Sequence, residues 1–137
     1  MEIKIFEKLP VYSVDIRNEV FVKEQGFCEE FDEADKIATH LVGFENDIGA
    51  ATCRIIKRDD NSFLIGRIAV RKSFRERGYG SEIVRAAEEY IKSLNGSLIY
   101  IHAQIRAMEF YKKLGYLPIG EPDEDEGCPH QMMFRKI

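Results

Sequence analysis

Arg75-Glu76-Arg77-Gly78-Tyr79-Gly80 is a glycine-bearing stretch between an apolar run, Phe63–Val70, and an amphipathic segment, Ser81–Leu94. This order predicts a strand, a tight turn and a helix, and a helix start leaves several backbone N–H groups without partners. Gly78 and Gly80 carry no Cβ, so the chain can bend there and a ligand can come close to the backbone. Because the positive end of the helix dipole lies at the same place, the stretch predicts a site for phosphate oxygens.

The composition is typical of a soluble globular protein, since 45% of the 137 residues are hydrophobic and 32% are charged. This length suits one domain, residues 1–137. We expect no membrane partner and a cytoplasmic location, because no long apolar window and no secretion signal are found. Cys28, Cys53 and Cys128 are widely spaced, which favours a reducing compartment. A net charge of −4 without a basic stripe argues against a nucleic-acid partner.

The first half of the chain is predicted to be strand, helix, loop and three strands. Glu2–Phe6 alternates as a strand does, Pro10 suits the first turn of a helix that runs to about Lys23, and the acidic stretch Glu24–Lys36 predicts a loop. Three further stretches separated by the turn residues Asn46-Asp47 and Asp59-Asp60-Asn61 predict antiparallel strands: Thr39–Glu45, Ile48–Lys57 and Phe63–Val70.

The second half is predicted to alternate helices and strands. The helix Ser81–Leu94 has one apolar face, and Glu88 and Lys92 are expected on its exposed face. The apolar run Leu98–Ala103 predicts a strand that is covered on both faces and parallel to its predecessor. The remaining predicted elements are a helix, Ile105–Leu114, two strands, Tyr116–Gly120 and Gln131–Arg135, and the acidic loop between them, Glu121–Gly127. This order implies an α/β (α+β) fold with one central mixed β-sheet flanked by helices.

Two blocks of sequence give the chain a family resemblance. Arg75, Gly78 and Gly80 match the Arg/Gln-x-x-Gly-x-Gly/Ala loop of the GCN5-related N-acetyltransferases. A second block of that family, Ala-x-x-Phe-Tyr-x-x-x-Gly-Phe/Tyr, is matched at Ala107, Phe110, Tyr111, Gly115 and Tyr116. Three further pieces resemble the small ElaA/YjcF-like branch: Val20-Phe21-Val22-x-Glu24-Gln25, His102-Ala103-Gln104 and Glu126-Gly127-x-Pro129-His130.

The resemblance implies a three-layer sandwich that binds acetyl-CoA, and it covers essentially the whole chain. Backbone amides of the loop would hold the pyrophosphate, and the strand before it would pair with the pantetheine arm. Gln104 stands where many members carry Asn, with the same amide on a longer side chain. The cofactor-binding residues that the resemblance implies are Ile68, Ala69, Val70, Arg75, Glu76, Arg77, Gly78, Tyr79, Gly80, Ser81, Gln104 and Tyr111.

Acetyl transfer to an amine needs a neutral amine, a donor to the developing oxyanion and a proton for the leaving thiolate. The amide of Val70 is a candidate oxyanion donor. Tyr111 is the candidate proton donor, because a phenol stays protonated at neutral pH; the alternative role is a core aromatic beside Phe110. His130, Glu24 and His102 are the candidate bases, although His102 lies within an apolar strand and suits a structural role better.

Other chemistries receive less support from the residues. Cys128 and His130 would share a face if extended, which allows a cysteine nucleophile, but direct transfer suits the resemblance better. His40 is expected to be structural, at an edge of the sheet. No grouping has zinc-ligand spacing, so no metal is expected. The stretch Arg75–Gly80 lacks the Gly-Lys-Ser/Thr ending of an ATP-binding loop.

The sequence therefore predicts an acetyl-CoA-dependent N-acetyltransferase, monomeric or homodimeric, that acts directly on an amine of a small molecule or peptide. The alternatives are a non-catalytic acyl-CoA-binding or regulatory module on the same fold, and an interaction domain that does not bind CoA. Two acidic loops predict that a cationic amine is steered to the site. Their carboxylates are Glu24, Glu29, Glu30, Asp32, Glu33 and Asp35 in one loop and Glu121, Asp123, Glu124, Asp125 and Glu126 in the other.

Overall fold

The computed structural model describes residues 1–28 and 31–137. Its strands are β1 (Glu2–Phe6), β2 (Thr39–Glu45), β3 (Ile48–Lys57), β4 (Ser62–Val70), β5 (Leu98–Gln104), β6 (Leu117–Pro118), β7 (Asp123–Asp125) and β8 (Cys128–Lys136). Its helices are α1 (Val11–Arg17), the π-helix η1 (Asn18–Glu24), α2 (Tyr79–Ser93), α3 (Met108–Lys113) and three 3₁₀ turns, η2 (Glu33–Lys36), η3 (Lys72–Phe74) and η4 (Ile105–Ala107).

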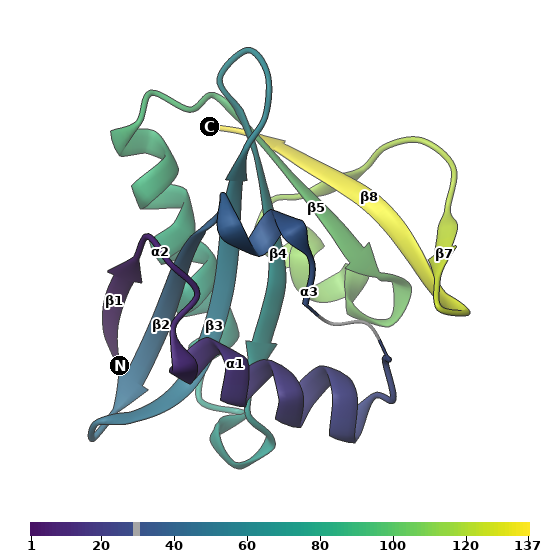
Figure 1. Cartoon of the computed structure of the whole chain (residues 1–137). Coiled ribbons are helices and arrows are strands. Elements are labelled where there is room, and N and C mark those ends of the chain that lie inside the picture. Colours follow the sequence, from purple (N-terminus) through teal and green to yellow (C-terminus); the bar gives the residue numbers. More distant parts are fainter. Residues whose placement is uncertain (29–30) are drawn as a thin grey trace.

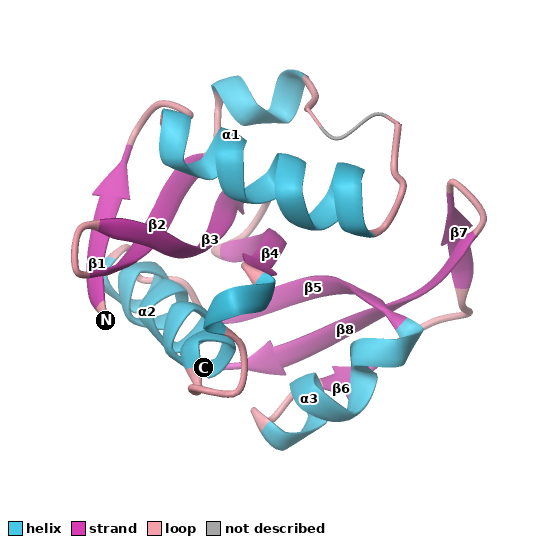
Figure 2. Cartoon of the chain, turned by 90° about the horizontal axis from the view of Figure 1, so that it is seen from below, coloured by secondary structure: helices cyan, strands magenta, loops and turns pink. Residues whose placement is uncertain are grey.

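The described strands form one sheet in the order β1-β2-β3-β4-β5-β8-β6, with β7 paired to β8 (Figure 1). Every neighbouring pair is antiparallel except β4 and β5, which run parallel. Helix α1 covers one face of the sheet, and α2 and α3 cover the other (Figure 2). This confirms the predicted mixed sheet between two layers of helices.

The parallel pair β4–β5 is short. The two strands pair only at Ser62–Leu98, Phe63–Ile99 and Leu64–Tyr100, and beyond these positions the pairing ends. Strand β4 continues to Val70 and β5 to Gln104, so the two strands separate and their facing edges have no strand partner there. A bulge opposite Cys53 adds one residue to β4, where Arg67 has a φ of +49°. The sheet is therefore open between its two halves.

Helix α2 closes the core over the left half of the sheet in Figure 1. Its apolar residues Ile83, Val84, Ala87 and Ile91 are fully buried, as the periodicity predicts. Glu88 is buried too, so its predicted exposure and its pairing with Lys92 are wrong. Its carboxylate accepts hydrogen bonds from the Tyr116 hydroxyl at 2.7 Å and from Arg85 at 2.7 Å, and it forms an ion pair with Arg135 at 3.0 Å. These contacts tie α2 to β8 and to the segment after α3.

The first predicted helix differs from the structure at its centre. The α-helix ends at Arg17, and the chain continues to Glu24 as a π-helix. The predicted loop Glu24–Lys36 contains the 3₁₀ turn η2 as well. A π-helix inserts extra residues per turn and is common at functional sites. Here it precedes Gln25 and Phe27, which line the site described below.

The C-terminal predictions need similar corrections. The predicted strand Tyr116–Gly120 is reduced to Leu117–Pro118, and β8 is longer than predicted. The predicted loop Glu121–Gly127 includes the strand β7, which forms a hairpin with β8. Burial alternates along β5 rather than covering both of its faces. His40 is buried on β2, an interior strand, so its predicted edge position is also wrong.

An ion-pair network joins η2 to the sheet. Arg17 binds Asp35 through two hydrogen bonds of 2.8 and 3.0 Å, and Arg17 is fully buried. Arg54 contacts both Asp35, at 3.0 Å, and Asp32, at 2.6 Å. Burial alone would raise the pKa of Asp35, but the hydrogen bonds from Arg17, from the backbone of Asp32 and from Arg54 hold that pKa well below its usual value.

We predict that Asp35→Asn lowers the free energy of unfolding by about 3 kcal/mol at pH 7, because it removes the carboxylate charge that pairs with the buried guanidinium groups of Arg17 and Arg54. Urea unfolding followed by circular dichroism measures this. Glu33→Gln in the same turn is the matched control, since Glu33 is exposed and pairs only with Lys36 among the described residues; we expect a change of less than about 0.5 kcal/mol.

The pH dependence follows from the lowered pKa of Asp35. The carboxylate stabilises the fold fully above the unfolded-state pKa of about 4. As the pH falls from there towards the lower folded-state pKa, the stability difference between the native chain and Asp35→Asn should shrink. A difference that stays constant between pH 7 and pH 2.5 would contradict this assignment.

Candidate functional site

A groove of about 520 Å³ lies between the end of β4 and the start of α2, and we call it the α2 groove. Gly78 precedes α2 with a φ of +77°, and no side chain caps the helix. The first backbone N–H groups of α2 are therefore available to a ligand. Gly80 serves a second purpose, because a Cβ there would lie 3.1 Å from the ring of Phe110. The glycines thus permit both the left-handed turn and the close packing of α3.

The backbone of Val70 faces this groove. Arg71 N–H donates to Ala50 O at 2.9 Å, so by the alternation of an antiparallel ladder the N–H and C=O of Val70 point away from β3. The carbonyl of Val70 accepts a hydrogen bond from Arg75 Nε at 3.0 Å. Its N–H points to the same open side. An extended ligand could pair with this edge of β4 as another strand would.

The side chain of Arg75 stabilises the loop between β4 and α2 through hydrogen bonds. Its two terminal nitrogens each donate to the carboxylate of Glu24 at 2.7 Å. These hydrogen bonds lower the pKa of Glu24, so the carboxylate is a weaker proton acceptor than an ordinary glutamate. Among the described residues, Glu24 lines neither the α2 groove nor the second cavity, between β4 and β5, that is described below. This geometry argues against the predicted role of Glu24 as a base.

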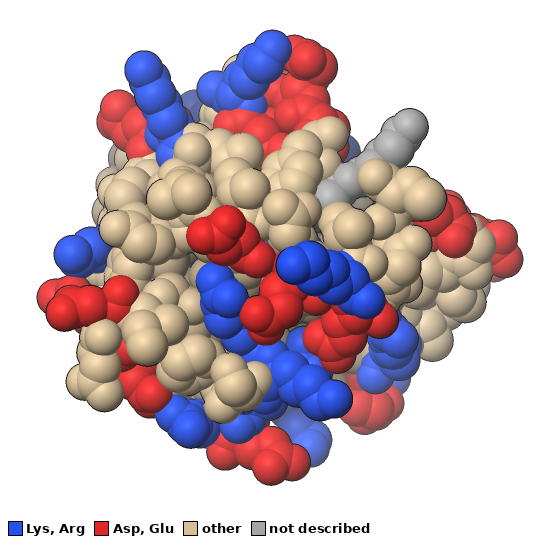
Figure 3. Space-filling view, turned by 60° about the horizontal axis from the view of Figure 1, so that its bottom comes forward, with Lys and Arg blue, Asp and Glu red and all other residues tan. Residues whose placement is uncertain are grey.

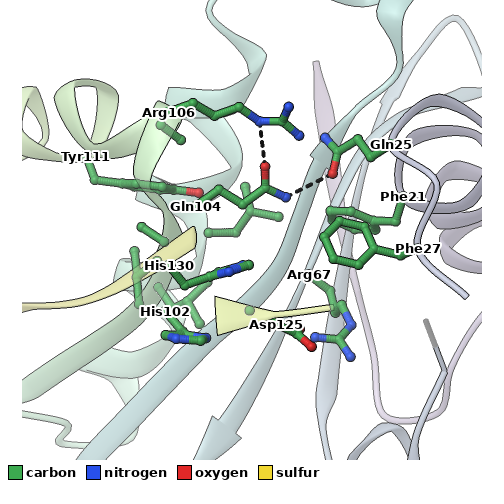
Figure 4. A pocket seen from close by; sticks show the side chains of 16 residues that line it. Phe21, Gln25, Phe27, Arg67, His102, Gln104, Arg106, Tyr111, Asp125 and His130 are labelled. Atoms are coloured by element: carbon green, nitrogen blue, oxygen red, sulfur yellow. Dashed lines mark hydrogen bonds between the residues drawn. The ribbon is translucent and has the colours of Figure 1, made fainter. Parts of the chain in front are cut away.

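A second cavity, of about 230 Å³, lies where β4 and β5 separate, and we call it the inner pocket (Figure 4). Phe21 and Phe27 form one wall, with ring centroids 6.4 Å apart. His102 and His130 form the opposite wall, and Arg67, Asp125 and Gln104 contribute polar groups. The bulge at Arg67 and the hairpin β7–β8 bring these side chains together from distant parts of the sequence.

The two histidines are stacked, with ring centroids 4.6 Å apart and planes inclined by 22°. His130 is buried, and its Nδ1 lies 2.8 Å from the carbonyl oxygen of Cys128, so Nδ1 is the donor. In the neutral ring Nε2 then carries the free lone pair. His102 Nε2 lies 2.7 Å from a carboxylate oxygen of Asp123 on β7. His102 is therefore oriented by a carboxylate, whereas His130 has a nitrogen suited to accept a proton.

Tyr111 lies at the junction of the α2 groove and the inner pocket. Four residues line both cavities: Gln25, Ile68, Ala107 and Tyr111. Burial raises the pKa of Tyr111, with a smaller effect from Cys53. Its phenol therefore stays protonated throughout the neutral range. A protonated hydroxyl at this junction can donate to a group that bridges the two cavities.

The structure brings together most of the predicted site residues. The α2 groove is lined by Ile68, Ala69, Val70, Arg75, Glu76, Gly78, Tyr79, Gly80, Ser81 and Tyr111. Two predicted cofactor residues lie elsewhere. Arg77 pairs with Glu45 at 2.7 Å, and Gln104 lines the inner pocket with its amide bonded to Gln25 and Arg106. Cys128 does not pair with His130 through its thiol, so the cysteine-nucleophile alternative lacks its base.

Several lining residues were not predicted as site residues. Val20, Phe21 and Gln25 belong to a motif quoted for the resemblance, as do Ala107 and Phe110, so a sequence signal existed for them. Phe27, Arg67 and Arg106 carry no such signal, and Asp125 is predicted only as one of the carboxylates of the second acidic loop. They reach the site through the π-helix, the bulge in β4, the turn η4 and the hairpin β7–β8.

Arginines pair with three carboxylates of the first predicted acidic loop. In the first loop Glu24 pairs with Arg75, Asp32 with Arg54 and Arg67, and Asp35 is buried. Glu29 and Glu30 lie outside the described residues. On the face shown in Figure 3, basic and acidic side chains lie intermingled. In the second loop Asp123 and Glu126 are engaged by His102 and by the backbone N–H of Cys28. The first acidic loop therefore does not support the prediction that a cationic amine is steered to the site.

The described part of the chain, residues 1–28 and 31–137, contains no group of three or more His, Cys, Asp or Glu side chains arranged to hold a metal ion. None of its helices has both the length and the apolar character of a membrane span.

Comparison with known proteins agrees with this geometry. The model of the acetyltransferase (GNAT) domain matches residues 12–137. YjcF of Bacillus subtilis, described as an uncharacterized N-acetyltransferase, is 36% identical over 125 residues, which cover 88% of this chain and 87% of YjcF. The crystal structure of Escherichia coli ElaA superimposes with a TM-score of 0.86 at 29% identity and covers 98% of both chains.

A more distant structure shares the fold alone. The acetyltransferase from Bacillus subtilis in complex with CoA is 19% identical, has a TM-score of 0.72, and covers 99% of this chain and 98% of its own. The domain match and the YjcF relationship establish the family. The chain belongs to the GNAT acetyltransferases.

We predict that Glu24→Gln loosens the loop before α2. Loss of the bidentate ion pair with Arg75 should raise the hydrogen-exchange rates of the amides of residues 76–80 by about fivefold, as expected for a half-exposed pair worth up to about 1 kcal/mol. Exchange read by mass spectrometry or NMR measures this. Glu76→Gln is the control, and equal exchange in both variants would show that the pair does not brace the loop.

Proposed function

We propose that this protein transfers the acetyl group of acetyl-CoA to a primary amine by direct attack. The observation that carries the proposal is the junction at Tyr111, where the α2 groove meets the inner pocket. A groove with free helix N–H groups and an open strand edge suits a long phosphorylated thioester. A polar pocket with an imidazole base suits the amine. The Bacillus subtilis acetyltransferase of the same fold was crystallised in complex with CoA, which supports a CoA-binding role.

The residues of this chain would hold the co-substrate as follows. The amides of residues 76–81 would bind the pyrophosphate, and the open edge of Ile68–Val70 would pair with the pantetheine arm. Acetyl-CoA supplies the acyl group as a thioester. The N–H of Val70 would stabilise negative charge that develops on the carbonyl oxygen. Glu76 and Ser81 complete the lining near the helix start.

His130 would serve as the base, directly or through water. Its Nε2 would take a proton from the amine as the new N–C bond forms. The C–S bond breaks in the same transfer, and Tyr111 would donate its proton to the departing sulfur. His102, oriented by Asp123, would hold the imidazole of His130 in place by stacking. The acceptor is an amine of a small molecule or peptide, and the protein would act in the cytoplasm.

The alternative is a non-catalytic module that binds acyl-CoA. The free Nε2 of His130 and the buried hydroxyl of Tyr111 favour the enzyme, because binding alone requires neither. A screen of amines and peptides for release of CoA thiol tests the proposal. Acceptor-dependent release supports it, whereas tight acetyl-CoA binding without turnover of any amine would support the module.

We predict that Gly78→Val weakens CoA binding about tenfold or more, because a Cβ would enter the path of the pyrophosphate. That Cβ would meet no protein atom within 4 Å, so the loss would not reflect protein packing. Isothermal titration calorimetry measures the affinity. Gly120→Val is the matched control, since Gly120 has a similar φ of +76° and equal space. If both variants bind CoA alike, the phosphate site lies elsewhere.

We predict that Tyr111→Phe lowers kcat by about 10²- to 10⁴-fold and leaves acetyl-CoA affinity unchanged, the range typical of a lost acid–base group. Steady-state kinetics and calorimetry on the folded variant give the two quantities. A variant with nearly native kcat would return Tyr111 to the role of a core aromatic.

A further inference from the structure

Gln25 and Gln104 connect the two sides of the opening between β4 and β5. The side-chain Nε2 of Gln104, at the end of β5, donates to Oε1 of Gln25 at 2.9 Å (Figure 4). The other end of the Gln104 amide accepts a hydrogen bond from Arg106 Nε at 2.7 Å. The backbone N–H of Gln25 donates to Val20 O at 3.1 Å at the end of the π-helix. Both glutamines are thus fixed in place by defined partners.

This bond lies where the two cavities adjoin. Gln25 lines both the α2 groove and the inner pocket, as do Ile68, Ala107 and Tyr111. Gln25 lies on the side of η1, and the other three lie on β4, η4 and α3. A group that spans the two cavities would therefore lie beside these four side chains.

We propose that Gln25, held by Gln104, limits the acyl group to a short chain, so that the donors are acetyl-CoA and acyl-CoAs of similar size. This inference rests on the proposed function. The thioester must reach the junction for the amine to attack it, so the carbons beyond the carbonyl extend towards Gln25 or into the inner pocket. That pocket holds only about 230 Å³ and must admit the amine as well.

A longer acyl chain meets two obstacles. It must either displace Gln25, which breaks the hydrogen bond between the half-buried side chains of Gln25 and Gln104, or occupy the space of the amine. Displacement of Gln25 should weaken the binding of a six-carbon donor by about tenfold or more relative to acetyl-CoA, whereas occupation of the amine's space should lower kcat/KM for that donor. Removing the Gln25 side chain should open the junction and reduce the difference in affinity between acetyl-CoA and the six-carbon donor.

The test is calorimetric binding of acetyl-CoA and hexanoyl-CoA to the native chain, Gln25→Ala and Lys23→Ala, with kcat/KM for both donors once an amine is known. Lys23→Ala is the control, because Lys23 lies nearby on η1 and lines neither cavity among the described residues. We expect hexanoyl-CoA to bind about tenfold or more weakly to the native chain and to the control, and within about threefold of acetyl-CoA in Gln25→Ala.

Three outcomes separate the possibilities. The inference is overturned if the difference in affinity between acetyl-CoA and hexanoyl-CoA persists unchanged in Gln25→Ala. It is overturned as well if the native chain shows no such difference. Both outcomes leave the proposed function intact. Failure of the native chain to bind CoA or either acyl-CoA overturns the proposed function itself. If Gln25→Ala does not fold, Gln104→Ala removes the partner that fixes Gln25 and must narrow the same ratio of dissociation constants.

Discussion

The parallel strands β4 and β5 pair over only three residues each. The site exists because the two strands separate beyond these residues. A sheet that stayed paired would satisfy its own backbone groups and leave no room for a ligand. The separation leaves one edge of β4 open and creates the inner pocket. It also places the end of β4 beside the uncapped start of α2, so a strand edge and a helix N-terminus face the same groove.

Buried charge contacts fix the elements on both sides of the opening between β4 and β5. On one side, Arg17, Asp35 and Arg54 fasten η2 to β3, and Asp32 extends this network to Arg67 at the bulge. On the other side, Glu88 joins α2 to β8 through Arg135. Since a buried charge without its partner costs several kcal/mol, these networks hold η2 against β3 and α2 against β8.

The sequence predicts what depends on local pattern. The strand, turn and helix around Gly78, the periodic face of α2 and the Tyr111 block all follow from spacing that a single segment contains. The bulge that turns Arg67 into the pocket does not, because it results from the register of two strands. The burial of Glu88 is also not local, since its partners Tyr116 and Arg135 are distant in sequence. Gln104 was predicted to contact the cofactor, but its bond to Gln25 joins residues 79 positions apart.

The central claim is that CoA enters the opening between β4 and β5 and reaches Tyr111. A crystal structure of the protein soaked or co-crystallised with CoA tests this most directly. We expect the pyrophosphate to lie against the amides of residues 76–81, the pantetheine to run along Ile68–Val70, and its sulfur to lie within hydrogen-bond distance of the Tyr111 hydroxyl. CoA bound away from β4, or a sulfur remote from Tyr111, would contradict it.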